Sequence, residues 1–265
     1  MSAPTPGTGT LWLVPTPLDF GTLDAAGEAP DLRDVLPMGT LQTAARLTHW
    51  VVENAKTARG FLKRVQAVVP LAQPLQSLQI QELPRPPKGQ RGAAPALPDA
   101  LLQPALQGQE MGLMSEAGMP AVADPGAELV RRAHALGLTV MPLVGPSALL
   151  LAVAASGMNG QSFAFVGYLP VDETARASRI RELEGLSRRL GQTQLVIETP
   201  YRNAALFQAL LQHLQPTTQL SVACGLTLAK GWNHSAPVAQ WREGQGRAGQ
   251  RPPADQPTVF AWLAR

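Results

Sequence analysis

Apolar residues recur along this chain with two different periods, and the period separates its predicted strands from its predicted helices. Short apolar runs bounded by Pro, Gly or polar residues predict buried strands. Stretches with apolar residues three or four positions apart predict helices that pack on one side. The predicted strands are 11–14, 49–52, 78–80, 112–115, 139–143, 162–167, 194–197, 220–224, 228–234 and 258–263. Outside the central stretch, the predicted helices are 32–36, 41–47, 57–65, a turn after Asp99, 174–190, 203–214 and 237–241, and Asn203 is expected to cap the helix that it begins.

The central stretch, from Gly112 to Gly157, predicts a strand–helix–strand–helix unit. Its first helix is expected to begin at Asp124, with the carboxylate as N-cap and Pro125 at the first helical position. The sequence Gly145-Pro146-Ser147 opens the second helix. Strands that alternate with helices through the first half of the chain predict a doubly wound parallel sheet.

Two loops of this unit have the character of a ligand site. Ser115 to Gly118 and Gly145 to Ser147 each follow a predicted strand and consist mostly of small residues. Small residues let a ligand approach the backbone at the carboxyl edge of a parallel sheet. Glu116 adds a carboxylate at the tip of the first strand. Gly118 and Gly145 can equally serve only to make turns, so these residues by themselves leave a ligand site at this edge open.

Composition narrows the class of protein. The chain has 265 residues, of which 45% are hydrophobic and 15% are charged, which indicates a globular protein with room for two domains. The net charge of +3 permits a polyanionic partner without requiring one. The one cysteine, Cys224, excludes an internal disulfide and is expected to be a small core residue. The four histidines lack metal-ligand spacing, so no metal is expected.

Neither a membrane segment nor a signal peptide is predicted. The longest apolar run, Ala148–Ala155, is shorter than the roughly 20 residues that span a bilayer. The N-terminal residues lack the basic flank and apolar core of a signal peptide. We expect a cytoplasmic protein with no membrane partner. Arginines on the predicted helix Thr174–Leu190 alternate with glutamates, so this helix is expected to have a solvated charged face.

The two central loops read SEAGMPAVADPG (115–126) and PLVGPSALLLAVAASG (142–157). They resemble SDAGTPxISDPG and PGPSAxxxAxxxSG of the tetrapyrrole methylase superfamily, in its branch of ribosomal RNA small subunit methyltransferase I. The order of further motifs is also similar. These are LWLVPTP (11–17) against LYLVPTP, VENAK (52–56) against AEDTR, FAFVGYLP (163–170) against FxFxGFLP, ETPYR (198–202) against ESPHR, and Leu226-Thr227 against RELTK.

The motifs on the cofactor side persist, whereas those on the acceptor side differ from the branch. PTPxGN of the branch reads PTPLDF at 15–20, without its Gly and Asn. Asn54 and Lys56 replace the Asp and Arg of AEDTR, and Glu116 replaces the Asp of SDAG. A segment with His and Asn that the branch has after its third strand reads ELPRPPK at 82–88.

The resemblance implies two α/β domains with S-adenosylmethionine bound in the cleft between them. Residues 10–157 would form the doubly wound domain and residues 158–265 a domain with a mixed sheet. It also implies an RNA acceptor, the ribose 2′-hydroxyl of small-subunit ribosomal RNA, and a homodimer. The chain has no GxGxxG, in agreement with this superfamily. By motif position, the cofactor would contact Pro15, Met114, Ser115, Glu116, Met119, Ser147 and Ala148 from the first domain, and Glu198, Leu226 and Pro257 from the second.

Methylation of a ribose hydroxyl also needs a base or an electrostatic aid. The polar residues at strand ends that can supply it are Glu53, Lys56, Glu198 and Arg202. Glu53 can equally pair with Lys56, and Arg202 can simply anchor its loop. Two other functions remain open: methylation of a small molecule, including a tetrapyrrole, and a non-catalytic relative that binds the cofactor or RNA.

Overall fold

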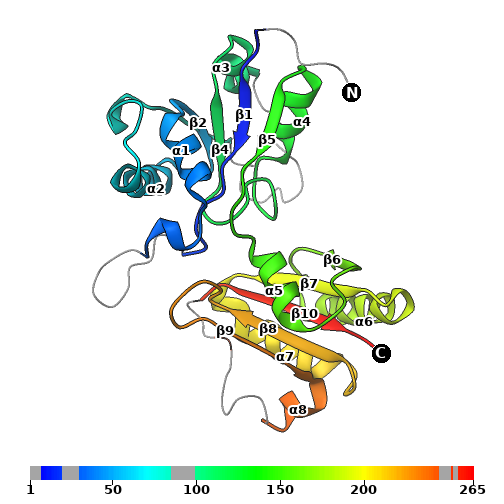
Figure 1. Cartoon of the computed structure of the whole chain (residues 1–265). Helices are drawn as coiled ribbons and strands as arrows, with labels where there is room; N and C mark the ends of the chain where they lie inside the picture. Colours follow the sequence, from blue (N-terminus) through cyan, green and yellow to red (C-terminus); the bar gives the residue numbers. More distant parts are fainter. Residues whose placement is uncertain (1–6, 20–29, 85–98, 245–251, 253–255) are drawn as a thin grey trace. The chain divides into compact units, whose positions relative to one another are not determined.

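The computed structural model describes residues 7–19, 30–84, 99–244, 252 and 256–265. The chain folds as two compact units, Met1–Pro146 and Ser147–Arg265, which are described separately below (Figure 1). From the sequence, the boundary between the two domains is expected after Gly157, at the end of helix α5 (Ala148–Ser156). In the structure the two units divide before this helix, between Pro146 and Ser147. The structure differs because α5 packs its buried side chains against strands of the second unit.

The first unit is built on a five-stranded sheet in which every neighbouring pair of strands is parallel. The strand order is β3-β2-β4-β1-β5. The strands are β1 (Thr10–Leu13), β2 (His49–Val52), β3 (Gln79–Glu82), β4 (Met111–Met114) and β5 (Thr139–Pro142). Because all five run in the same direction, their carboxyl ends form one edge of the sheet.

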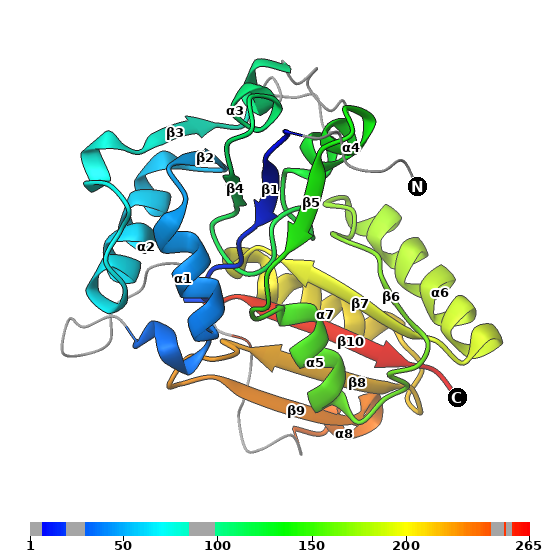
Figure 2. The same ribbon diagram turned by 45° about the horizontal axis from the view of Figure 1, so that its top comes forward.

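Helices cover both faces of this sheet, with α1 and α2 on one side (Figure 2). On β2, Trp50 and Val52 belong to the core cluster that α1 and α2 complete, whereas Val51 belongs to the opposite cluster with α3 and α4. This alternation confirms the predicted doubly wound parallel sheet. The remaining elements are η1 (Leu32–Asp34), α1 (Met38–Arg46), α2 (Ala55–Val68), η2 (Leu75–Ser77), η3 (Asp99–Leu102), α3 (Gln103–Leu106) and α4 (Ala127–Ala135).

The second unit contains a mixed five-stranded sheet of order β6-β7-β10-β8-β9. Its one parallel pair among the described strands is β6 with β7, and the other three pairs are antiparallel. The mixed sheet agrees with the expectation from the resemblance. The strands are β6 (Phe163–Phe165), β7 (Thr193–Glu198), β8 (Gln219–Cys224), β9 (Trp232–Pro237) and β10 (Thr258–Leu263).

This sheet is also buried on both faces. Phe260 and Trp262 of β10 face the larger core cluster, which α6 (Glu173–Leu190), α7 (Asn203–His213) and α8 (Val238–Arg242) complete. Val259 and Ala261 face α5 on the other side. Neighbouring positions of β10 therefore pack against different layers, as the two-residue period of a strand requires. A short 3-10 helix, η4 (Pro200–Arg202), connects β7 to α7.

Two predicted helix caps are wrong. Helix α4 begins at Ala127 with Gly126 as N-cap, at φ 128° and without a side-chain cap, so Asp124 does not cap it. Asn203 is the first residue of α7 and not its cap. Its buried amide instead donates hydrogen bonds to the Gln256 carbonyl oxygen (2.8 Å) and the Thr258 hydroxyl (3.0 Å). Asn203 thereby attaches the start of α7 to the start of β10.

The other predicted elements agree with the structure to within a few residues at each end, except that β9 begins at Trp232 and not near Leu228. Cys224 is a buried free cysteine, as expected. Most of the predicted N-terminal tail and of the loops 17–30, 84–98 and 243–256 lies outside the described residues.

The second unit contains a buried carboxylate whose replacement is expected to destabilise the fold. Glu184 of α6 is 4% exposed. It accepts hydrogen bonds from the Gln215 amide (2.8 Å) and the Thr218 hydroxyl, which hold the turn between α7 and β8. Glu184→Ala leaves the buried Thr218 hydroxyl without this acceptor and releases the Gln215 amide, which costs about 1–3 kcal/mol in the free energy of unfolding. Urea denaturation measures this loss.

The matched control is Glu182→Ala on the same helix. Glu182 pairs with Arg179 at 2.7 Å and its side chain is 58% exposed, so its loss should change the free energy of unfolding by less than about 0.5 kcal/mol. Equal losses in the two variants would contradict a structural role for the Glu184 hydrogen bonds.

Candidate functional site

The sequence-predicted residues Pro15, Glu53 and Met114 lie at the carboxyl edge of the parallel sheet in the first unit. Pro15 follows β1, Glu53 follows β2, and Met114 ends β4. Backbone hydrogen bonds between neighbouring segments continue past the ends of the strands. The Val14 amide donates to the Leu113 carbonyl oxygen (2.8 Å), and the Glu53 amide donates to the Met114 carbonyl oxygen (3.1 Å). The loops that leave these strands are therefore held side by side.

The loops after β1 and β4 are joined directly. Thr16 and Gly118 exchange two backbone hydrogen bonds of 3.0 Å each, and the Thr16 hydroxyl donates to the Ser115 carbonyl oxygen at 3.4 Å. Gly118 has φ +77°, and a Cβ atom there would lie 3.2 Å from Leu18. This position requires glycine because an L side chain rarely adopts that backbone conformation.

Gly145, in the loop after β5, is required for packing inside the protein. A Cβ atom at this position would lie 2.3 Å from Cγ of Pro15. The loop is fixed further by the Thr40 hydroxyl, which donates to the Val144 carbonyl oxygen at 2.8 Å. From the sequence, Gly145 is expected to let a ligand approach the backbone. The structure gives a second reason for glycine at this position, which is the close contact between the loops after β1 and β5.

Ser115 is a buried polar residue at this edge, and its hydroxyl is free to bind a ligand. The residue is 4% exposed, and its Oγ atom has no hydrogen-bond partner among the described residues. A buried hydroxyl without a partner costs free energy, because it loses its hydrogen bonds to water. A ligand that hydrogen-bonds to Oγ recovers this loss.

Three carboxylates lie close together beside Ser115. An oxygen of Glu53 accepts a hydrogen bond from the Glu116 amide at 3.2 Å, which connects the residues after β2 and β4. Burial, together with the charges of Glu53 and Glu116, raises the pKa of Asp124 to about 7. The pKa of the Asp124 carboxyl therefore lies close to neutral pH.

The sequence analysis missed Asp124, because it interpreted the residue as a helix cap. The predicted strands contained a usable signal: Glu53 and Glu116 each follow a strand by one or two residues, and adjacent parallel strands place such residues together. Asp124 itself has no comparable signal, since the irregular turn 115–126 decides where it lies. Lys56, which the sequence also offers as a catalytic residue, is exposed on the first turn of α2.

The residue at position 54 retains a defined structural role. The Asn54 side chain accepts hydrogen bonds from the Lys56 amide (2.9 Å) and the Thr57 amide (3.4 Å), and so caps α2. Asp and Asn are about equally good N-caps. The exchange of Asp for Asn relative to the AEDTR motif therefore preserves the start of this helix.

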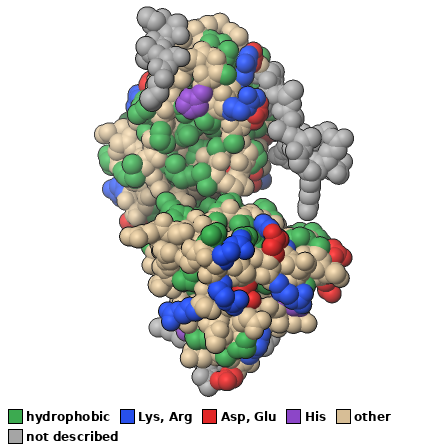
Figure 3. Space-filling view, turned by 90° about the vertical axis from the view of Figure 1, so that its right-hand side faces the viewer, with side chains coloured by type: hydrophobic (Ala, Val, Ile, Leu, Met, Phe, Trp, Pro, Cys, Tyr) green, Lys and Arg blue, Asp and Glu red, His purple; other side chains and the backbone are tan. Residues whose placement is uncertain are grey.

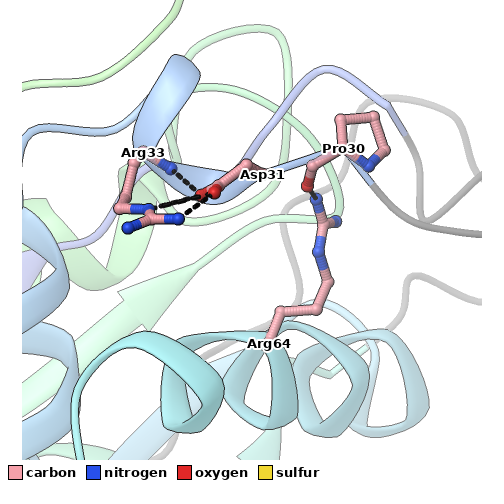
Figure 4. A network of polar contacts seen from close by, with 4 residues as sticks. All are labelled: Pro30, Asp31, Arg33 and Arg64. Atoms are coloured by element: carbon pink, nitrogen blue, oxygen red, sulfur yellow. Dashed lines mark hydrogen bonds and ion pairs between the residues drawn. The ribbon is translucent and has the colours of Figure 1, made fainter.

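The segment after β1 is anchored to α2 by Arg64. Its guanidinium pairs with the buried Asp19 carboxylate at 2.8 Å and donates to the Pro30 carbonyl oxygen at 2.8 Å. Figure 4 shows Arg64 reaching Pro30 from α2, next to the pair formed by Asp31 and Arg33. Arg64 thus holds Asp19 and Pro30, which lie eleven positions apart in the sequence. Hydrogen bonds from Arg33 lower the pKa of Asp31 to about 2.

The sequence-predicted residues of the second unit also gather at one end of their sheet. Thr258, at the start of β10, lies opposite Glu198 of β7 and Cys224 of β8. The Gly225 amide donates to the Pro257 carbonyl oxygen at 2.9 Å. Glu198, Pro257 and Leu226 therefore lie close in space. Leu226 and Ala148 each pack against the core cluster beneath α5, and Ser147 is the N-cap residue of that helix.

Glu198 and Arg202 form an anchor for the turn between β7 and α7. They pair at 2.8 Å, and the Glu198 side chain is 1% exposed. Glu198 also accepts hydrogen bonds from the Thr199 amide (2.8 Å) and the Thr199 hydroxyl (3.2 Å). These contacts favour the structural interpretation of Arg202 over the catalytic one.

Among the described residues, no group of three or more His, Cys, Asp or Glu side chains is arranged to hold a metal ion. Within the same ranges, no helix combines the length and the apolar character needed to cross a membrane.

Comparisons with known proteins agree with this architecture. The family described as Tetrapyrrole (Corrin/Porphyrin) Methylases matches residues 41–231. The native form of uroporphyrin III C-methyl transferase from Thermus thermophilus shares the fold, with a TM-score of 0.52 at 16% identity over 96% of this chain and 97% of that one.

Curated relatives match over shorter stretches. Ribosomal RNA small subunit methyltransferase I of Vibrio cholerae is 34% identical over 140 residues, which are 53% of this chain and 47% of that protein. The protein of the same name from Xylella fastidiosa is 41% identical over 87 residues, 33% of this chain and 32% of that protein. The matched part thus spans a third to a half of the length of these relatives. Because the family match itself extends over most of the sequence, this chain belongs to the tetrapyrrole methylase family.

Proposed function

We propose that this protein is an S-adenosylmethionine-dependent methyltransferase whose acceptor is a ribose 2′-hydroxyl of small-subunit ribosomal RNA. The observation that carries the proposal is the carboxyl edge of the first unit, which lies largely within the matched family region. At this edge the buried Ser115 hydroxyl has no partner among the described residues, and the Asp124 carboxyl, with a pKa of about 7, lies close to it. The names of the curated relatives support the choice of RNA.

The residues at this edge fit a cofactor that binds largely through backbone groups. Ser115 offers its buried hydroxyl, and the loops around Pro15, Met114, Glu116 and Met119 are held by hydrogen bonds before a ligand arrives. Such preorganisation reduces the entropy lost on binding. The part of the predicted cofactor site in the second unit, namely Ser147, Ala148, Glu198, Leu226 and Pro257, stays a prediction from the resemblance, as does the homodimer.

S-adenosylmethionine supplies a methyl group that its sulfonium already activates. The protein then has to align the acceptor hydroxyl and take its proton. We assign proton acceptance to Asp124, because it shares this edge with Glu53 and Glu116. A base works best when its pKa lies near the working pH, and the pKa of Asp124 fulfils this condition. Glu53 and Glu116 would then act on the reaction through their charges.

The alternative of a non-catalytic relative gains little support from the altered motifs. Asn54 preserves the helix cap, and Glu116 preserves a carboxylate where the motif has Asp. A small-molecule acceptor remains the second enzymatic alternative, and turnover with RNA or with a tetrapyrrole separates the two.

The first prediction concerns the Ser115 hydroxyl. Calorimetric titration with S-adenosylhomocysteine should show binding to the native protein and binding weaker by roughly five- to tenfold for Ser115→Ala, the effect of one lost hydrogen bond. The free energy of unfolding should not fall, because Oγ has no partner within the described residues. Ser178→Ala, on the exposed face of α6, is the control. No binding to the folded native protein would remove the methyltransferase proposal, and unchanged affinity of Ser115→Ala would remove the role of Ser115.

The second prediction concerns the pH dependence of stability. The pKa of Asp124 rises from 3.8 to about 7 on folding, so the folded state binds more protons than the unfolded state between these values. Stability therefore falls as the pH rises through this window. Asp124→Asn removes the buried charge and should raise the free energy of unfolding by about 1–2 kcal/mol near pH 8, after allowance for solvent screening.

Urea denaturation at about pH 4.5 and about pH 8 measures this difference. The control is Asp34→Asn, an exposed carboxyl, which should leave the pH dependence unchanged. If the free energy of unfolding depends on pH equally in Asp124→Asn and in the native protein, Asp124 does not titrate in this window, and its assignment as the base fails.

A further inference from the structure

The face of the second unit that Figure 3 shows carries several Lys and Arg side chains, with Asp and Glu side chains between them. Arg176 and Arg181 of α6 lie next to His213, the last residue of α7. The Arg181 Nη2 atom is 3.2 Å from Nδ1 of His213. Burial, followed by the charges of Arg181 and Arg176, lowers the pKa of His213. The protein thus places three groups that can carry positive charge around one point.

Among the described residues, neither Arg176 nor Arg181 forms an ion pair. The Arg176 Nη1 atom donates a hydrogen bond to a neutral acceptor, the Val171 carbonyl oxygen, at 2.9 Å. The sequence of α7 contains no acidic residue. By contrast, Arg179, two residues before Arg181, pairs with Glu182 at 2.7 Å. The arrangement therefore differs from the solvated face of alternating charges that the sequence predicts for α6.

The end of α7 does not neutralise this charge. The carboxyl end of a helix attracts cations through its free carbonyl groups. Here Arg242 of α8 already bonds to two of these groups, the Leu211 carbonyl oxygen (2.7 Å) and the Leu214 carbonyl oxygen (2.8 Å). Arg242 thus adds a positive charge at the end of α7, where the buried Glu184 carboxylate accepts hydrogen bonds from Gln215 and Thr218.

We propose that Arg176, Arg181 and His213 form a binding site for the phosphates of an RNA strand. The proposal rests on the proposed function in that the acceptor is RNA. An extended anion fits better than a single one, because Arg188 lies two helical turns beyond Arg181 on the same side of α6, about 10 Å along its axis. The Arg188 Nε atom also donates to the Arg265 carbonyl oxygen at 3.2 Å, which fixes this side chain at the end of the row. The site lies wholly within the second unit and is separate from the carboxyl edge of the first.

The test measures binding of a short fluorescent single-stranded RNA to the full chain over a range of KCl concentrations. Arg181→Glu is compared with Arg179→Glu, which makes the same change in net charge on the same helix. Arg181→Glu should weaken binding more than Arg179→Glu and should lower the slope of log K against log salt by about 0.7 for each lost phosphate contact. If both variants weaken binding equally, only the general field of the unit acts, and the site is refuted.

A second measurement follows His213 itself by NMR, with His213→Gln to assign its signal. Bound phosphate stabilises the imidazolium, so RNA should raise the pKa of His213 in the native protein. An unchanged pKa with saturating RNA refutes the site. If inorganic phosphate alone raises the pKa and Arg181→Glu leaves RNA binding unaffected, the site takes small anions and the RNA assignment is refuted.

Titration with S-adenosylhomocysteine in the same samples separates this inference from the proposed function. Arg181→Glu should bind the cofactor product as the native protein does, because the substitution lies outside the residues assigned to the cofactor. Normal cofactor binding with an unaltered salt slope for RNA refutes the phosphate site alone. Absent cofactor binding to the native protein refutes the proposed function, whatever the RNA measurement gives.

Discussion

The parallel pairing of β1, β2 and β4 is the constraint on which the candidate site depends. In register, Leu11 and His49 both lie opposite Met111, so the three strands end at the same level. Parallel strands cannot be joined by tight turns, and each end must lead into a crossover connection. The residues that begin these connections are far apart in the sequence, yet they lie side by side. Thr16 and Ser115 are in hydrogen-bond contact for this reason.

The same constraint explains why acidic residues collect where repulsion makes them costly. Glu53 and Glu116 follow adjacent strands, and the turn after β4 returns Asp124 to them. Like charges in a partly buried region oppose folding, and the protein lowers this cost when one carboxyl keeps its proton. In the segment after β1, the buried Asp19 carboxylate is instead paired with the Arg64 guanidinium.

The sequence predicts the sheets well because strand periodicity and the order of strands and helices are local properties. His49–Val52 and Thr258–Leu263 were predicted with their observed bounds. Errors occurred where a side chain had two possible partners. Asn is a residue type that often caps helices, but the Asn203 side-chain amide donates hydrogen bonds to residues more than fifty positions away. Asp124 was misassigned for the same reason, since proximity to Glu53 is a long-range property that no spacing within the loop reveals.

Buried polar groups distinguish the structural part of this protein from the part with functional character. Glu184 and Glu198, both buried, accept several hydrogen bonds each and hold turns in place. Ser115 is as deeply buried, but its hydroxyl is left without a partner. Among the described residues His234 also has an unpartnered ring nitrogen, but its ring packs edge-on against Trp241 in the core of the second unit. Within the described ranges, Ser115 combines an unsatisfied group with neighbouring titratable residues at the edge of a parallel sheet. Since such an edge is where α/β proteins bind ligands, the unsatisfied hydroxyl is best explained by a partner that binds there.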